Sequence, residues 1–231
     1  MTMATLLIRL AGPMQSWGGE SKYNKRHTWR VPSKSAVIGL AAAALGRRRD
    51  DDISDLAALR FGCRTDREGK LLRDFQTTFN GEKATNVIEK YYLSDAVFLV
   101  GLEGDEELLR EIDAAIKRPA FPLFLGRRSC PPVGRVTLGL RECQLETALA
   151  SEPCLVPAAG ETVKLRIAAE TPDMAKNAYF LRDIPVSFDP SHRMFGFRRV
   201  HEYTAECPAA AEEIRGEAST FHDPMKELEV L

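Results

Sequence analysis

The sequence predicts an α+β protein with a ferredoxin-like core, and three observations support this class. A strand, a helix and a strand follow one another over residues 4–66, and the same order returns over residues 93–125. A polar, irregular segment separates these two halves. The resulting β-α-β-β-α-β order is the ferredoxin-like unit that RNA-recognition domains also use. We therefore expect a core domain over residues 1–140 and a smaller β-rich region over residues 141–231.

The first strand and the first helix are indicated by composition and by start and stop residues. The stretch ATLLIRLAG at residues 4–12 favours a strand and ends at a Gly-Pro pair. Apolar residues recur at helical spacing over residues 31–48, after the start signals Pro32 and Ser33 and before the stop signal Gly46. The free backbone N–H groups of this helix would point at an anion beside its first turn.

The middle of the chain predicts strands on either side of an insertion. Residues 59–66 favour a strand, and residues 71–79 are either a second strand or its continuation. Residues 80–92 are polar and lack a clear period, so they form the irregular insertion. Residues 93–102 predict a buried strand.

A second helix and a closing strand complete the predicted core. Residues 105–118 show helical periodicity, with acids at the start and bases at the end that complement the helix dipole. The apolar run FPLFL at residues 121–125 predicts the last core strand. Beyond residue 140, β-like stretches appear at TVKLRIAAE, DIPVSF and FGFRRVHEYTAE.

Composition places the chain among ordinary globular proteins. Of its 231 residues, 44% are hydrophobic and 28% are charged. Five cysteines without any Cys-x-x-Cys pair argue against a disulfide framework and a zinc ribbon, which favours a reducing, cytoplasmic setting. A signal peptide and an apolar run of about 18 residues are both missing from the sequence, so we expect no membrane association.

Charge is distributed unevenly along this nearly neutral chain. The formal net charge is −1, yet residues 1–35 and residues 117–135 each carry a local net charge of +5. Residues 202–231 carry a net charge of −6. Two basic blocks in a neutral protein indicate a local site for a polyanion.

The connection over residues 11–35 is the first candidate binding segment. Loops between a strand and a helix usually have about two to six residues, so this longer connection is expected to have a function. It interleaves two Trp, one Tyr and five bases, which suits the stacking and phosphate contacts of single-stranded nucleic acid. The alternative is a loop that packs its Trp residues into the core, with Trp17 the stronger core candidate.

The loop after residue 125 is the second candidate. Gly126 ends an apolar run, and Arg127 and Arg128 follow on a backbone stiffened by two prolines. An isolated arginine pair commonly faces solvent, so the rest of the chain decides whether this pair faces an anion.

Evidence for catalysis is weak in the sequence. The histidines lack metal-ligand spacing, and the sequence contains no nucleophile elbow, P-loop or dinucleotide fingerprint. A metal-independent ribonuclease could use His27 as its base, with Lys22, Tyr23 or Lys25 nearby. A stacking or surface role for His27 is favoured, as is a packing role for Cys130. We therefore expect no enzyme activity and no cofactor.

Four separated motifs carry a resemblance to a known family. RLAGPMQSWG (9–18), RHTWRVPSKSAVIGLAAAALG (26–46), LRDF (72–75) and LGRRSCP (125–131) resemble the Cas family-five subunits of the type I-E CRISPR Cascade complex, in the RAMP superfamily. The resemblance spans residues 5–140 in the family's order and spacing.

This resemblance implies a non-catalytic RNA-binding subunit of an antiviral ribonucleoprotein. Such subunits cap one end of Cascade and hold the 5′ handle of the CRISPR RNA. They project a β-hairpin thumb between the second and third core strands, here near residues 76–92. The thumb contacts the backbone subunit, the large subunit docks nearby, and target DNA is reached only through the complex.

Two alternatives remain open. Some type I-C relatives process precursor RNA with a Tyr-Lys-His set, which cannot be aligned here, so an endoribonuclease would depend on His27. A stand-alone RNA chaperone or regulator would need no thumb.

The resemblance and the two basic blocks together nominate the site residues. The expected RNA-binding residues are Gln15, Ser16, Trp17, Arg26, His27, Thr28, Arg30, Ser33, Lys34, Ser35, Gly126, Arg127, Arg128 and Ser129. The expected partner-binding residues of the thumb are Gln76, Thr77, Phe79, Val87, Ile88, Tyr91 and Tyr92.

Overall fold

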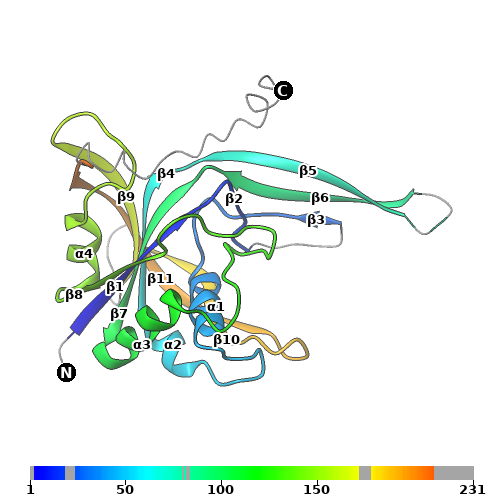
Figure 1. Cartoon of the computed structure of the whole chain (residues 1–231), viewed down its shortest axis with the longest axis horizontal. Coiled ribbons are helices and arrows are strands. Elements are labelled where there is room, and N and C mark those ends of the chain that lie inside the picture. The colour runs from blue at the N-terminus through cyan, green and yellow to red at the C-terminus, as the bar shows by residue number, and fades with distance from the viewer. Residues whose placement is uncertain (1–2, 19–23, 80, 82–83, 172–177, 211–231) are drawn as a thin grey trace, which may run out of the picture.

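A seven-stranded, antiparallel sheet forms the centre of the molecule (Figure 1). The computed structural model describes residues 3–18, 24–79, 81, 84–171 and 178–210, and the structural statements below concern these residues. In order across the sheet, the strands are β10 (Ala178–Ser187), β11 (Met194–Pro208), β9 (Thr162–Glu170), β4 (Arg60–Arg67), β7 (Val97–Asp105), β1 (Met3–Ala11) and β8 (Thr137–Arg141).

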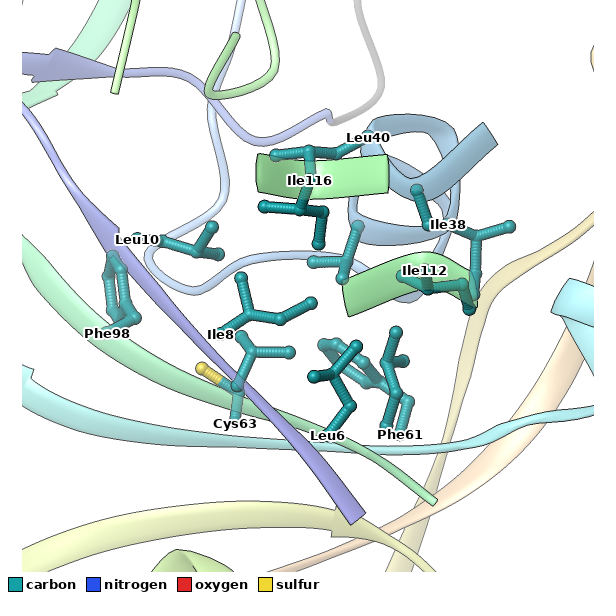
Figure 2. Packing of buried hydrophobic residues seen from close by; sticks show 14 of the residues in the cluster. Leu6, Ile8, Leu10, Ile38, Leu40, Phe61, Cys63, Phe98, Ile112 and Ile116 are labelled. Atoms are coloured by element: carbon teal, nitrogen blue, oxygen red, sulfur yellow. The ribbon is translucent and has the colours of Figure 1, made fainter. Parts of the chain in front are cut away.

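Helices cover both faces of this sheet. On one face lie α1 (Lys34–Ala44), α2 (Ser54–Ala58) and α3 (Glu106–Lys117), and on the other lies α4 (Leu145–Ser151). Figure 2 shows Leu6, Ile8 and Leu10 of β1 pointing into the larger core beneath α1 and α3. Leu7 points the other way and packs with α4. A strand buried on both faces needs apolar residues at successive positions, which explains the composition of β1.

Four adjacent strands contain the predicted core order. β4, β7, β1 and β8 are neighbours, and each pair among them is antiparallel. α1 lies between β1 and β4 along the chain, and α3 lies between β7 and β8. The strands predicted at residues 4–12, 59–66 and 93–102 and the helices predicted at residues 31–48 and 105–118 are present, with shifts at their ends.

The predicted strand at residues 121–125 is wrong. Pro122 has no N–H to donate to a ladder, and Phe121 donates its N–H to the carbonyl of Ala43 instead. Leu125 donates to the carbonyl of Cys130 within a turn. The last core strand is β8, which pairs with β1.

The segment expected to be irregular is largely a strand. β5 (Lys70–Phe79) and β6 (Ala84–Ser94) pair as a long hairpin, which extends away from the seven-stranded sheet in Figure 1. β2 (Met14–Gln15) pairs with β6 antiparallel, and β3 (Lys25–Arg26) pairs with it parallel. Residues 80 and 82–83 lie outside the described part of the chain. The helices α2 and α4 were also not predicted.

The three C-terminal strands extend the core sheet. The predicted β-rich character is confirmed, and β9 pairs with β4 through a register that joins Gly62 to Ala169. β11 pairs with β9, and β10 pairs with β11. The region after residue 140 therefore continues the sheet of the first part, and its separation as a folding unit stays a prediction.

Buried ion pairs join this C-terminal extension to α1. Asp183 of β10 accepts a hydrogen bond from the backbone N–H of Lys34 at 2.8 Å, and it pairs with Arg198 of β11 at 2.5 Å. The Lys34 ammonium lies 2.9 Å from Glu170 of β9. Burial lowers the pKa of Lys34, and the neighbouring Glu170 opposes that effect. Asp183, Arg198 and Lys34 are at most 5% exposed, so each depends on its partner for compensation.

Replacing Asp183 should therefore destabilise the fold strongly. Asp183→Ala leaves the Arg198 guanidinium and the first turn of α1 without their acceptor, and we expect the free energy of unfolding to fall by about 3–5 kcal/mol. Urea denaturation measures this change. Asp50→Ala, at an exposed aspartate, should change stability by less than about 0.5 kcal/mol. Equal effects of the two variants would contradict a structural role for Asp183.

Candidate functional site

The two basic segments singled out in the sequence lie against each other. Ser16 donates its backbone N–H to the carbonyl of Leu125 at 3.0 Å. Gly126 has a φ of +84°, and a Cβ at this position would clash with the carbonyl oxygen of Ser16. The positive φ and the lack of space for a Cβ both require glycine here. The loop after β1 therefore packs directly on the loop that precedes β8.

The Gly126 loop is a tight turn that exposes its basic tip. The N–H of Leu125 donates to the carbonyl of Cys130 at 2.7 Å, and the N–H of Cys130 donates to the carbonyl of Arg127 at 2.9 Å. Arg128 and Ser129 are exposed, whereas Cys130 is buried. The backbone of the turn thus anchors the cysteine and directs Arg128 outward.

Arg127 lies between the two segments and a strand of the hairpin. Its guanidinium carbon is 4.8 Å from the centre of the Tyr92 ring, and its Nη2 donates to the carbonyl of Arg26 at 3.0 Å. Its Nη1 is buried and has no hydrogen-bond partner among the described residues. A buried, charged donor without a partner is costly, so this position favours an additional acceptor.

A second group of cations and aromatic rings lies at β3 and at the adjacent strand β6. β3 holds Arg26 beside β6, and the His27 ring stacks on the Tyr91 ring at 5.2 Å with an interplanar angle of 14°. Arg26, His27 and Arg30 are exposed. Cations beside an exposed, stacked ring can contact phosphates and bases at one surface.

Three predicted RNA-binding residues are buried supports for this surface. Gln15 donates to the carbonyl of Ala96 at 2.6 Å and accepts from the Trp17 indole at 3.1 Å. Ser16 donates its hydroxyl to the carbonyl of Tyr91, and Trp17 has no exposed surface. The expectation of direct RNA contact by these side chains is corrected, because they hold the loop to the core. Thr28 has a related role, accepting the N–H of Trp17 at 2.8 Å.

The start of α1 does not offer a free anion site. The Ser33 side chain accepts the N–H of Ala36, Ser35 bonds Ser33, and the N–H of Lys34 is taken by Asp183. Lys34 is 1% exposed and paired with Glu170. The expectation that Ser33 and Lys34 bind RNA is therefore wrong for these side chains. An internal carboxylate already occupies the position expected for an external anion.

The hairpin residues divide into two groups. Gln76, Thr77, Phe79 and Val87 are exposed, and Ile88 is partly buried. Tyr91 stacks on His27, and Tyr92 is 5% exposed beneath Arg127. Tyr91 and Tyr92 were predicted to contact a partner, but Tyr92 cannot do so because Arg127 covers it. Sequence spacing did not associate these tyrosines with the basic loops, since the contacts span more than 30 residues.

The described residues contain no group of three or more His, Cys, Asp or Glu side chains placed to hold a metal ion. Of the possible partners of His27, Lys22 and Tyr23 lie outside the described residues, and Lys25 lies on β3. None of the described helices has the length and apolar character needed to cross a membrane.

Four of the five cysteines are buried. Burial raises the pKa of Cys63, Cys130, Cys154 and Cys207, whereas Cys143 is partly exposed. The effect at Cys130 opposes activation by the adjacent arginines, which supports the packing role expected from the sequence.

Alkylation should therefore distinguish these thiols. In the native protein at about pH 8, we expect iodoacetamide to modify Cys143 first, because a buried, protonated thiol reacts slowly. Peptide mass spectrometry reports the modified positions, and unfolding in urea should make all five equally reactive. Rapid native labelling of Cys130 would contradict the packing role.

A family model and a curated protein match large parts of this chain. The family model described as "CRISPR-associated protein (Cas_Cas5)" matches residues 5–201. The chain is 36% identical over 171 residues to "CRISPR system Cascade subunit CasD" of Escherichia coli (strain K12), covering 64% of this chain and 73% of that protein.

Two solved structures share the fold. "Crystal structure of Cas protein" is 43% identical, with a TM-score of 0.71, over 87% of this chain and 94% of that one. A chain of "CRISPR RNA-guided surveillance complex" is 31% identical, with a TM-score of 0.74, over 98% of this chain and 100% of that one. The match to the second structure includes the C-terminal extension of the sheet.

Proposed function

Since the chain belongs to the CRISPR-associated Cas5 family, we propose that it is a non-catalytic, RNA-binding subunit of a type I-E CRISPR Cascade complex. In this proposal it holds the 5′ handle of the CRISPR RNA and caps one end of the backbone filament, in a cytoplasmic ribonucleoprotein for antiviral defence. Its partners are the RNA, the backbone subunits and the large subunit, and it meets target DNA through the complex.

The observation that carries this proposal is the contact between the two basic loops. Ser16 and Gly126 are 110 positions apart, yet their backbones touch, which puts Arg26 beside Arg127. Both loops come from blocks with a net charge of +5. A surface formed by both blocks attracts a polyanion more strongly than either block alone.

The chemistry of this surface suits single-stranded RNA. Arg128 is exposed at the tip of its turn, and the Nη1 of Arg127 lacks an acceptor among the described residues. These guanidiniums are suited to phosphate oxygens or base edges. The exposed His27 ring, held flat against Tyr91, offers a face for a base.

The core and the hairpin support the finer features of the proposal. The order β4-β7-β1-β8, with α1 and α3 as its crossovers, supports a ferredoxin-like core. The β5–β6 hairpin enters between β4 and β7, where the family's thumb belongs. Phe75, Phe79 and Val87 are at least half exposed on this hairpin. Large exposed apolar side chains favour a protein partner, which we take to be the backbone subunit.

Replacing the arginine pair should weaken the salt dependence of RNA binding. Each phosphate contact on a single strand contributes about −0.7 to the slope of log K against log salt concentration. If Arg127 and Arg128 each meet one phosphate, Arg127→Gln with Arg128→Gln should flatten this slope by about 1.4. Fluorescence anisotropy with a labelled, repeat-derived 5′-handle RNA measures it.

The matched control is Arg48→Gln with Arg49→Gln, an adjacent and exposed arginine pair outside this surface. It should leave the slope unchanged, and an equal effect of both pairs would return Arg127 and Arg128 to a solvent-facing role. The same RNA incubated with the protein in EDTA should stay intact. Cleavage at one position, lost in His27→Ala, would favour the endoribonuclease instead.

Shortening the hairpin should affect assembly more than stability. Residues 76–88 are replaced by Asn-Gly, a favoured two-residue turn, so that Phe75 and Glu89 remain opposed as they are now. The removed part protrudes from the core, so we expect the melting temperature to stay nearly unchanged while association with the backbone subunit and guide RNA falls sharply.

Co-purification from cells that express the other Cascade subunits measures this association, and Arg48→Gln with Arg49→Gln again serves as control. Normal assembly of the shortened protein would overturn the thumb assignment. Failure of both the shortened and the intact chain to assemble would favour a stand-alone RNA-binding protein.

A further inference from the structure

The exposed face of β10 and β11 carries a regular pattern of aromatic rings and arginines. Phe180 lies opposite Arg199, and Arg182 lies opposite Phe197 in the antiparallel register. In each pair the guanidinium covers the ring, at 5.3 Å for Arg199 on Phe180 and 5.8 Å for Arg182 on Phe197. The two rings are therefore diagonal neighbours on one face of the sheet.

The pattern continues along β11. Because side chains alternate between the two faces of a strand, Phe195, Phe197, Arg199, His201 and Tyr203 share this face. Arg193 lies over Phe195 at 5.2 Å, and His201 stacks on Tyr203 at 5.3 Å. The result is a row of aromatic rings with cations beside them, on what we call the β10–β11 face.

The two phenylalanines at the cation–ring pairs lie outside the hydrophobic core, although Tyr203 at the other end of the row packs against it. Phe180 is 67% exposed and Phe197 is 64% exposed. The intervening residue Arg198 points to the opposite face, where it pairs with Asp183 in the interior. Beside Phe197 the buried positions of β11 are Arg198 and Val200, whereas Tyr203, Ala205 and Cys207 further along the strand pack into the interior. The exposed phenylalanines therefore need another explanation than folding.

The charge on this face selects between possible partners. Arg182, Arg193 and Arg199 bring cations to the rings, whereas Asp183, the acid within β10, is buried and already paired. Arginine and aromatic residues are enriched at protein interfaces as well, but a protein partner usually also finds acids among them. Residues 195–201 of β11 contain no Asp or Glu. Rings that stack with bases next to cations that meet phosphates are the arrangement used for single strands.

We propose that the β10–β11 face is a second surface for single-stranded nucleic acid, which it binds by stacking and without base specificity. Phenylalanine offers bases only a ring face, which every base can use. β10 is the outer strand at one end of the seven-stranded sheet, and β2, β3 and β6, which carry the Arg127 surface, belong to a separate sheet. The proposal goes beyond handle binding and does not depend on it.

The test uses the full chain and a labelled oligothymidylate of about twelve nucleotides as the probe. Phe180→Leu with Phe197→Leu keeps apolar bulk but removes both ring faces. We expect this variant to bind the probe about tenfold more weakly or worse, since stacking contributes substantially at each base. Arg182→Gln should also weaken binding and flatten its salt dependence.

The matched control is Phe121→Leu, at an exposed phenylalanine outside this face. It should bind the probe like the unmodified protein, and thermal melting checks that every variant is folded. The Arg127→Gln, Arg128→Gln protein should bind the probe normally, so a failure of handle binding is separable from a failure here. Phe180→Ala with Phe197→Ala provides a second variant without side-chain bulk.

Unchanged probe affinity in both phenylalanine variants would overturn the proposal. Loss of probe binding in the Arg127→Gln, Arg128→Gln protein would do the same, because the probe would then occupy the Arg127 surface. If the alanine variant binds the probe normally but no longer associates with the other Cascade subunits, the face is a protein interface instead.

Discussion

The pairing of β1 with its two neighbours, β7 and β8, determines where the candidate site forms. β1 is antiparallel to both of its neighbours, with Ala11 opposite Val97 of β7 and Ile8 opposite Thr137 of β8. The end of β1 therefore lies beside the starts of both neighbouring strands. Three connections meet there: the loop after β1, the hairpin before β7 and the Gly126 loop before β8. Their contacts, including the close approach of Gly126 to Ser16, follow from this register.

Elements with a strong local period could be predicted, and elements defined by distant contacts could not. The sequence of α3 has acids at its start, apolar residues at helical spacing and bases at its end. The apolar run of β1 likewise indicates a buried strand. β6 gave no such signal because Val87 is half exposed and Ile88 beside it is only partly buried, so no alternation marks this part of the strand. The apolar run at residues 121–125 was misleading, since Pro122 and the turn at Gly126 prevent strand pairing there.

The site was predictable in its loops but not in the roles of individual side chains. Two basic blocks separated by about a hundred residues identified the surface, because charge density is a property of the sequence. Lys34 looked equally suited to RNA, yet Glu170 and Asp183 come from strands more than 130 residues away. Tyr92 showed the same error, since it was expected to face a partner and its position under Arg127 depends on the packing of β6. Only tertiary contacts separate a cation that faces solvent from one that is neutralised inside.

This separation explains how a chain with a net charge of −1 can present positive surfaces. The buried or partly buried cations Lys34, Arg60, Arg64 and Arg198 are each paired with a carboxylate, so they contribute little to the external field. Burying a charge without a partner costs too much free energy, so the buried bases of the described residues are matched by carboxylates. Among the exposed cations, Arg26 and Arg128 lie at the two contacting loops, and Arg182 and Arg193 lie on the β10–β11 face. Each face combines these cations with aromatic rings, so in the proposed binding of RNA the attraction for a polyanion comes from local geometry and not from total charge.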